Sequence, residues 1–391
     1  MIYLDHAATV PMREEALKAM TAALREDWGN ASPTYPIAQR AKARLDGART
    51  ILADTIHAGW RELFFTSGGT ESDNWALIGT AEALKEKGKH IVVSAIEHHA
   101  VLHTCEYLES RGFEVTRLPA DGEGLVRPHD LAAVLDARPD TILVSLMAVN
   151  NEIGTIEPID VCCKYAHDHG VLFHTDAVQA YGKLPLSVEE VPVDLLSVSA
   201  HKIGGPKGIG FLYIRNGVQP QALIHGGSQE SGRRAGTENV PAAVGFAAAA
   251  QEAMAEMQEE QAREAALQQY FAEGLHRLFG DYRATGKKGD FLWNGAPIGP
   301  RRAVSNLSIS FPGLDTQALL INLDLAGICA SGGSACTTGA VDPSHVITAI
   351  CPDPAVARGT LRFTLGPENT NKEIDTVLRE LKAITERMKT L

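Results

Sequence analysis

The chain has 391 residues, a length that suggests a large domain accompanied by a smaller one. Hydrophobic residues make up 45% of it and charged residues 21%, the balance of a globular protein rather than a disordered or fibrous one. Acidic residues outnumber basic ones by 48 to 36, a net charge of −12, so nucleic acids and anionic membrane surfaces are not expected partners.

The segment from Met1 to Pro11 has neither the basic start nor the apolar run of a secretion signal. No apolar stretch reaches the roughly 20 residues of a membrane span, so we expect a cytoplasmic protein. Six cysteines form no Cys-x-x-Cys pair and no zinc-like cluster, and we therefore expect neither a disulfide framework nor a metal site.

Short apolar runs rich in β-branched residues alternate with amphipathic segments through the first half of the chain. They predict helices at 72–87 and 158–169, and strands at 63–66, 90–94, 141–145, 171–174, 195–199 and 210–214. This alternation predicts a mostly parallel sheet with helices on both faces. In such sheets, ligands bind at the carboxyl ends of the strands.

A long run rich in Ala, Glu and Gln at 242–278 predicts one helix that could bridge two domains. Beyond it, the pattern predicts strands at 306–311 and 361–365 and helices at 316–325, 343–350 and 371–388, an α+β arrangement. We expect a large domain at 15–260 and a small domain made of 1–14 and 261–391. A cleft between them is the expected active site.

The segment from Thr66 to Ser72 leads from a strand through two glycines into a helix. Backbone N–H groups and the helix dipole converge there, which suits a phosphate group. A merely tight strand-to-helix turn explains this segment equally well.

Two further residues follow predicted strands. Asp176 ends one strand, where a carboxylate could keep a pyridine nitrogen protonated, although a helix N-cap is the commoner role of such an Asp. Lys202 begins a glycine-rich loop after the next strand, where a desolvated lysine could form a Schiff base with an aldehyde cofactor. Lys207, on the same loop, is the alternative candidate.

Taken in order, these segments resemble the class V aminotransferases, and most closely their cysteine desulfurases of the nitrogen-fixation and iron-sulfur-assembly type. The resemblance covers nearly the whole chain. Its motifs are Tyr3–Thr9, Thr66–Ser72, Glu97–His98, Asn150–Gly154, Asp176–Gln179, Ser199–Lys202, Arg234–Asn239, Gly333–Thr337 and Arg362. It implies an α/β fold of the aspartate aminotransferase type (fold type I), with a mostly parallel seven-stranded sheet and a smaller α+β domain.

The resemblance also implies pyridoxal 5'-phosphate as cofactor. By it, Lys202 looks like the lysine that holds the cofactor and shuttles protons, Asp176 like the partner of the ring nitrogen, and Gln179 like the donor to the ring hydroxyl. His98 looks like the imidazole that stacks on the ring, with His99 a bystander. The residues similar to those that hold the phosphate are Gly69, Thr70, Ser199 and His201.

Thr237 resembles a residue that reaches the phosphate of the neighbouring subunit, which implies a homodimer. Asn151 and Arg362 match positions that bind the substrate, and the planar fork of Arg362 suits an α-carboxylate. The alternating Leu361, Phe363 and Leu365 put Arg362 on the opposite face of its strand. A surface arginine on an edge strand is the alternative.

Cys336 lies among small residues, in a loop composition that favours movement. By resemblance it is the thiol that takes the sulfur of L-cysteine as a persulfide, leaves L-alanine, and passes the sulfur to an acceptor or scaffold protein. Iron-sulfur assembly, nitrogenase maturation, tRNA thiolation and DNA phosphorothioation are possible destinations. The other cysteines are expected to be core residues.

Other functions remain open at this point. A selenocysteine lyase, or another class V lyase or aminotransferase, would keep Lys202 and Asp176 without needing a persulfide on Cys336. A non-catalytic scaffold would need none of the three.

Overall fold

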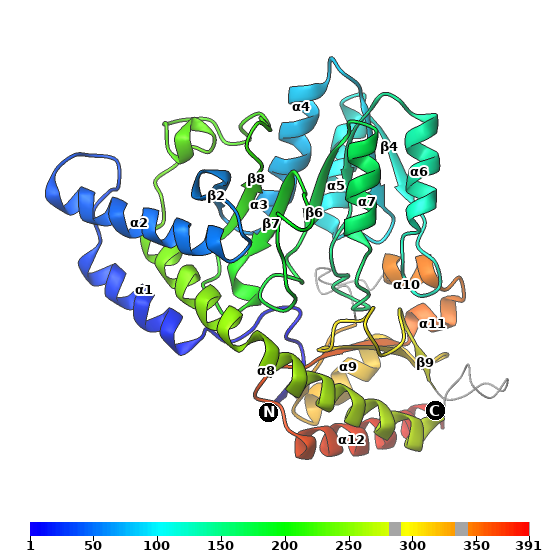
Figure 1. The fold of residues 1–391 in the computed structure, drawn as a ribbon. Helices are drawn as coiled ribbons and strands as arrows, with labels where there is room; N and C mark the ends of the chain where they lie inside the picture. The colour runs from blue at the N-terminus through cyan, green and yellow to red at the C-terminus, as the bar shows by residue number, and fades with distance from the viewer. Residues whose placement is uncertain (281–290, 333–342, 391) are drawn as a thin grey trace.

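The computed structural model describes residues 1–280, 291–332 and 343–390, built around a large and a small β-sheet (Figure 1). The predicted thiol, Cys336, lies outside the described residues. Within the described ranges, no helix combines the length and the apolar character needed to cross a membrane.

The large sheet has seven strands. Their order across the sheet is β2 (Leu63–Thr66), β8 (Gly210–Ile214), β7 (Leu195–Ser199), β6 (Leu172–Asp176), β5 (Thr141–Ser145), β3 (His90–Ser94) and β4 (Glu114–Leu118). Strand β8 runs antiparallel to both neighbours, and the pairs from β7 to β4 are parallel. The predicted mostly parallel seven-stranded sheet is therefore confirmed. Only β4 was not predicted, because its polar residues give an edge strand a weak pattern.

Helices cover both faces of this sheet. Along β3, Ile91 and Val93 pack on one face and Val92 packs on the other. The first face carries a continuous helical run of α3 (Gly69–Asn74), a π-turn (Trp75–Gly79) and α4 (Thr80–Leu84), together with α5 (His99–Ser110). The opposite face carries α2 (Pro36–Asp54), α6 (Pro128–Ala137) and α7 (Ile159–Asp168), while α1 (Glu14–Glu26) packs against the long helix α8 (Val240–Phe279) on the same side. Because both faces are buried, only the strand ends are open to a ligand.

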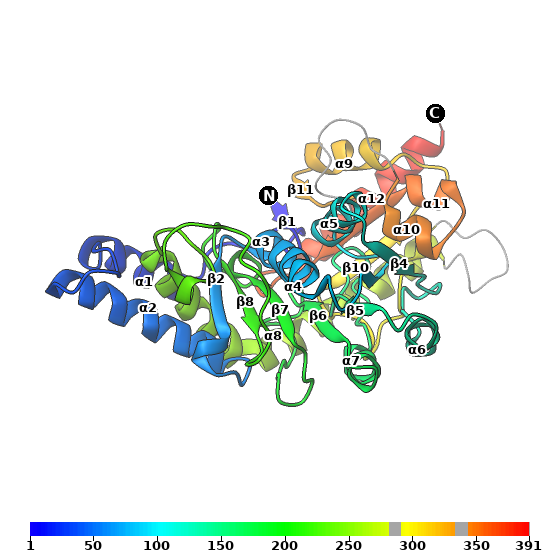
Figure 2. The same cartoon turned by 90° about the horizontal axis from the view of Figure 1, so that it is seen from above.

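The small sheet is antiparallel, with β10 (Asn306–Ser310) between β9 (Leu292–Trp293) and β12 (Thr360–Thr364). Around it lie α9 (Thr316–Leu325), α10 (His345–Ile350), α11 (Pro354–Arg358) and α12 (Asn371–Lys389). The first strand of the chain, β1 (Ile2–Tyr3), pairs with β11 (Ile328–Cys329), as Figure 2 shows. The N-terminal segment therefore packs with the last third of the chain.

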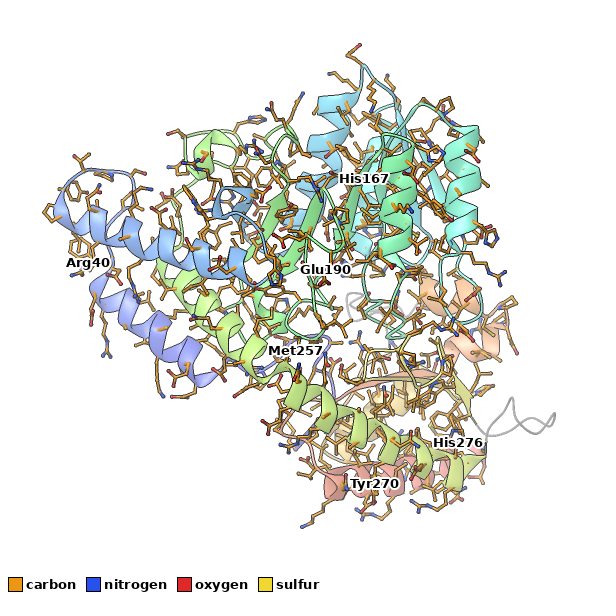
Figure 3. The ribbon with its side chains drawn as sticks, viewed as in Figure 1. Arg40, His167, Glu190, Met257, Tyr270 and His276 are labelled. Atoms are coloured by element: carbon orange, nitrogen blue, oxygen red, sulfur yellow. The ribbon has the colours of Figure 1, made fainter. Side chains whose placement is uncertain are left out.

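Helix α8 (Val240–Phe279) joins the two cores. Its first half buries Phe246 and several alanines against the large sheet. Its second half buries Phe271 and Leu275 in the hydrophobic core around the small sheet. Figure 3 labels Met257 between these halves and Tyr270 on the second, where the Tyr270 hydroxyl donates a 2.7 Å hydrogen bond to Asp375 of α12. We propose the domain division near residue 260, inside this helix, as the sequence analysis placed it.

Candidate active site

A cavity of about 380 Å³ opens where the carboxyl ends of the large-sheet strands meet the N-terminal segment and β12. Its size suits a small organic cofactor. Ten predicted site residues line it: Lys202, Asp176, Gln179, His98, Gly69, Thr70, Ser199, His201, Asn151 and Arg362. Side chains from separate motifs are thus brought to one place.

Lys202 sits in a short 3-10 turn (Ala200–Lys202) directly after β7. Its Nζ donates to the backbone carbonyls of Ala7 at 2.6 Å and Ala8 at 2.9 Å. Desolvation lowers the pKa of Lys202 to about 8, with the nearby Lys183 acting in the same direction. A lysine with this pKa supplies a neutral amine near physiological pH, as a nucleophile for an aldehyde requires.

Asp176 ends β6, and its Oδ1 accepts a 2.8 Å hydrogen bond from the N–H of Val178. Burial raises the pKa of Asp176 to about 6, while Lys202 opposes the rise. The group is therefore ionised at neutral pH. The described chain has no helix between β6 and β7, so Asp176 is not a helix N-cap. Its carboxylate holds the turn that follows the strand and lines the cavity.

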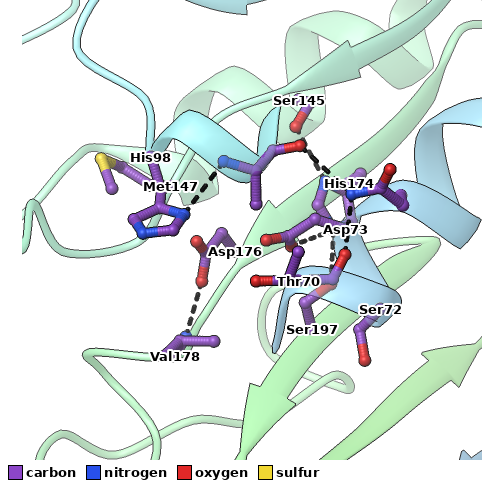
Figure 4. A network of polar contacts seen from close by, with 12 residues as sticks. Thr70, Ser72, Asp73, His98, Ser145, Met147, His174, Asp176, Val178 and Ser197 are labelled. Atoms are coloured by element: carbon purple, nitrogen blue, oxygen red, sulfur yellow. Dashed lines mark hydrogen bonds and ion pairs between the residues drawn. The ribbon is translucent and has the colours of Figure 1, made fainter. Parts of the chain in front are cut away.

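Behind Asp176 lies a buried polar network that the sequence analysis missed (Figure 4). The ring nitrogens of His174 lie 2.8 Å from the Ser145 hydroxyl and 2.9 Å from the Ser197 hydroxyl, and 3.7 Å separates His174 Nε2 from Asp73 Oδ1. Burial lowers the pKa of His174 to about 3 and, together with Asp176, raises that of Asp73 well above its usual value. The low pKa keeps the His174 ring neutral, and the raised pKa of Asp73 favours its protonated form beside the Asp176 carboxylate.

His98 precedes α5 as its N-cap, and its Nδ1 accepts a 3.1 Å hydrogen bond from the N–H of Ala100. Burial lowers the pKa of His98 to about 4, so the imidazole is neutral and its tautomer is fixed by that bond. His99, expected to be a bystander, also lines the cavity, and its ring centroid is 4.7 Å from that of His345.

The turn before α3 has the features of a phosphate site. Gly68 has a φ of +148°, and a Cβ at Gly69 would meet the Val178 side chain at 2.7 Å, so the backbone approaches the cavity closely there. The helical run that begins at Gly69 directs its first N–H groups toward that point. Ser199 lies beside the turn, and His201 is held by a 3.1 Å hydrogen bond to Thr9.

Arg362 projects from β12 toward the same cavity and is 2% exposed, which rules out the alternative of a surface arginine. Its Nη2 lies 2.7 Å from Asp5 Oδ1, and its Nη1 donates to the backbone carbonyl of Asn151 at 2.9 Å. These contacts hold the guanidinium at the cavity wall. The partnership with Asp5 was not predicted from the sequence.

The chemistry of this donor set fits pyridoxal phosphate. The cavity offers an amine of low pKa, one carboxylate for a ring nitrogen, a neutral imidazole and a glycine turn with N–H and hydroxyl donors for a phosphate. These groups come from α3, α5, β6, β7 and the N-terminal segment, so the fold brings them together from distant parts of the chain.

Thr237 does not join them: its side chain is exposed and lies outside the lining of this cavity. Among the described cysteines, Cys105, Cys162 and Cys163 are buried, as expected of core residues, and burial raises their pKa to about 12. Cys329 and Cys351 are only partly buried.

Comparisons with known proteins agree with this site. The family model "Aminotransferase class-V" matches residues 2–377. The chain is 45% identical to "Cysteine desulfurase IscS" of Dictyoglomus turgidum, covering 100% of this chain and 96% of that protein. Among solved structures, a "NIFS-LIKE PROTEIN" has a TM-score of 0.89 at 36% identity, with both chains fully covered. Another, "SspA in complex with cysteine", has a TM-score of 0.81 at 34% identity and covers 95% of this chain and 100% of its own.

Proposed function

The chain belongs to the class V aminotransferase family, and from this premise we propose that it is a pyridoxal-phosphate-dependent cysteine desulfurase that converts L-cysteine to L-alanine. The observation that carries the proposal is the pairing of Lys202, an amine of lowered pKa, with the ionised Asp176 in one cavity. A relative 45% identical over the whole chain carries the name of this activity, and one similar structure holds cysteine.

When bound, the cofactor supplies an electron sink, a ring that stabilises negative charge developing on the substrate's carbon atoms. The residues that would hold its ring are Lys202, Asp176, Gln179 and His98. Those that would hold its phosphate are Gly69, Thr70, Ser199 and His201. Lys202 Nζ, with a pKa of about 8, both accepts and returns a proton at neutral pH. The ionised Asp176 would stabilise positive charge at the ring nitrogen of the bound cofactor.

The substrate's carboxylate is proposed to bind Arg362 and Asn151, which line the cavity next to each other. Asp5 already occupies one side of the Arg362 fork, so it fixes the direction from which a second carboxylate approaches. This arrangement favours a small α-amino acid.

We propose that the Cys336 thiolate attacks the substrate sulfur. A sulfur–sulfur bond forms as the carbon–sulfur bond breaks, and the substrate carbon takes a proton in place of sulfur. The products are L-alanine and a persulfide on Cys336, so that atoms balance without an outside oxidant. An acceptor or scaffold protein then receives the sulfur, for iron-sulfur cluster assembly or another thiolation pathway. This role of Cys336 comes from the sequence.

A homodimer is proposed to complete the site, with Thr237 contacting the phosphate held by the neighbouring subunit. Its exposure and its absence from the cavity of its own chain support this role.

The test of the proposed function is a borohydride experiment. Treating the protein with borohydride in the presence of pyridoxal phosphate should fix the cofactor covalently to Lys202, as read by peptide mass spectrometry, while the native protein releases alanine from L-cysteine. In Lys202→Ala, both the adduct and the activity should disappear. An adduct on Lys207, with activity intact in Lys202→Ala, would refute the assignment.

A further inference from the structure

Thr237 lies on a segment that we call the arm, residues 229–239, between β8 and α8. Its base is fixed by a buried ion pair: Arg49 donates to both carboxylate oxygens of Glu230, at 2.6 and 2.7 Å. Glu230 also accepts the N–H of Phe65 in β2 at 3.1 Å. Glu230 and Ser231 have φ of 46° and 58°, a backbone that side chains rarely adopt, so the base of the arm keeps a conformation that these bonds enforce.

A second ion pair ties the arm to the phosphate turn. Arg234 Nε donates to Glu71 Oε1 at 2.8 Å and its Nη2 donates to Glu71 Oε2 at 3.0 Å. The same Oε2 accepts the N–H of Ser67 at 2.8 Å, and Glu71 directly follows Thr70, which lines the cavity. One carboxylate therefore holds both the turn at this subunit's cavity and the arm that carries Thr237.

The geometry of this pair limits how the arm can move. A guanidinium bonded through two nitrogens to one carboxylate is fixed in angle as well as in distance. Only two residues separate Arg234 from Thr237, so a displacement of Arg234 also displaces Thr237. The position of Thr237 is thus set by the phosphate turn of its own chain.

We propose that Glu71 and Arg234 are positioning residues for the cofactor phosphate of the neighbouring subunit, because their ion pair fixes the arm that presents Thr237. This inference rests on the proposed dimer. It adds a connection between the two sites, since the turn that grips one phosphate also orients the arm that grips the other.

The first experiment measures the rate at which the dimeric holoenzyme releases pyridoxal phosphate. Arg234→Gln and Glu71→Gln should each speed release by about tenfold, the effect of losing charge-assisted hydrogen bonds. The double variant should be no faster than Glu71→Gln alone, because Glu71→Gln already removes the carboxylate partner of Arg234. Arg234→Lys keeps the positive charge but loses the planar fork of the guanidinium. Its release rate should therefore lie between that of Arg234→Gln and that of the unchanged protein.

Arg233→Gln is the matched control. Arg233 is the neighbouring residue on the arm, but its guanidinium lies 5.1 Å from the Phe64 ring centroid and donates to Val218 O at 3.3 Å rather than to the phosphate turn. Its release rate should match the unchanged protein. Circular dichroism and sedimentation should show a folded dimer for every variant used.

The second experiment separates an effect on the neighbouring subunit from a local one. In hybrid dimers, one subunit carries Lys202→Ala, so that borohydride marks only the site of the other subunit. Adding Arg234→Gln to the subunit without the lysine should speed release from its neighbour's site. Acceleration only when Arg234→Gln lies on the lysine-bearing subunit would overturn the inference, because the ion pair would then act within its own chain.

Thr237→Ala distinguishes this inference from the proposed function. Fast release in Thr237→Ala with unchanged release in Arg234→Gln overturns the inference and leaves the dimer contact standing. Unchanged release in Thr237→Ala removes the dimer contact and the inference with it, while desulfurase activity, measured as alanine formation, stands separately.

Discussion

Single residues in this site owe their chemistry to burial. Lys202, Asp176 and His98 are ordinary residue types, yet desolvation brings the pKa of the amine down to about 8, that of the carboxyl up to about 6 and that of the imidazole down to about 4. At neutral pH, the site therefore combines a neutral imidazole, an ionised carboxylate and an amine close to its midpoint.

The pKa of Lys202 predicts how cofactor attachment depends on pH. Because the pKa is lowered, the reactive neutral amine accumulates as the pH rises through about 8, rather than through the value near 10.5 of an exposed lysine. The initial rate at which apoprotein forms its borohydride-reducible link with pyridoxal phosphate should rise between pH 7 and 9 and then level off. A rate that continues to climb to pH 10.5 would contradict the shift.

Asp176 and Asp73 should respond differently to the same substitution. Asp176→Asn removes the ionised group and should lower kcat for alanine formation by roughly two orders of magnitude, as the loss of one pre-organised electrostatic contact does. The raised pKa of Asp73 favours its protonated form, for which Asn is a close substitute, so Asp73→Asn should change kcat by no more than about threefold. Equal losses in both variants, with cofactor fully bound, would contradict this difference between the two carboxyls.

At the scale of elements, α8 packs closely against α1 and Pro206 at a glycine, Gly245. A Cβ at Gly245 of α8 would lie 3.0 Å from Met20 Cβ of α1 and 3.0 Å from Pro206 Cγ, whereas a Cβ at Gly47 of α2 would meet nothing within 4 Å. Helix propensity alone would make alanine favourable at both positions, by about 1 kcal/mol. Packing reverses this preference at Gly245.

These two glycines form a matched pair of stability tests. Gly47→Ala should raise the urea midpoint, by an amount that corresponds to as much as about 1 kcal/mol. Gly245→Ala should lower the midpoint, because the extra methyl group overpacks the interface of α8 with α1 at a cost of roughly 1–3 kcal/mol. A Gly245→Ala midpoint at or above that of the unchanged protein would mean that α1 can shift to make room.

At the scale of the whole molecule, the site depends on parts of the chain that pack together only in the tertiary fold. The N-terminal segment reaches the cavity because Ala7 donates its N–H to Thr364 of β12 at 2.8 Å and His6 contacts the same residue's carbonyl at 2.8 Å. The backbone carbonyls of Ala7 and Ala8 are thereby placed to accept hydrogen bonds from Lys202 Nζ. Segments from distant parts of the chain therefore meet at the Lys202 amine, the group that we propose reacts with the cofactor.

The fate of the sulfur is tested on the whole enzyme. Cys336→Ser should retain the cofactor and its visible absorption but lose alanine formation from L-cysteine, and it should carry no persulfide when probed with a thiol-reactive mass label. Alanine and sulfide release at the unchanged rate would favour a lyase that does not use this thiol.

The sequence by itself determined the alternation of strands and helices, the long bridging helix and the identity of Lys202 and Asp176, because the periodicity of side chains and the ends of strands are local features. Motif order along the chain pointed to the family. The polar network behind Asp176 was less visible: His174 lies two residues before Asp176 on one face of a strand, a detectable signal, but Asp73 comes from a helix far earlier in the chain.

Only the tertiary structure decided which groups meet. Asp5 and Arg362 are 357 residues apart, and Ala7 and Lys202 are 195 apart, and no period or spacing relates such pairs. The pKa shifts of the buried carboxyls also arise there, because pKa depends on burial and on neighbouring charge. The sequence thus named most of the residues that line the candidate site, while packing set their charge, their partners and the direction in which each one faces.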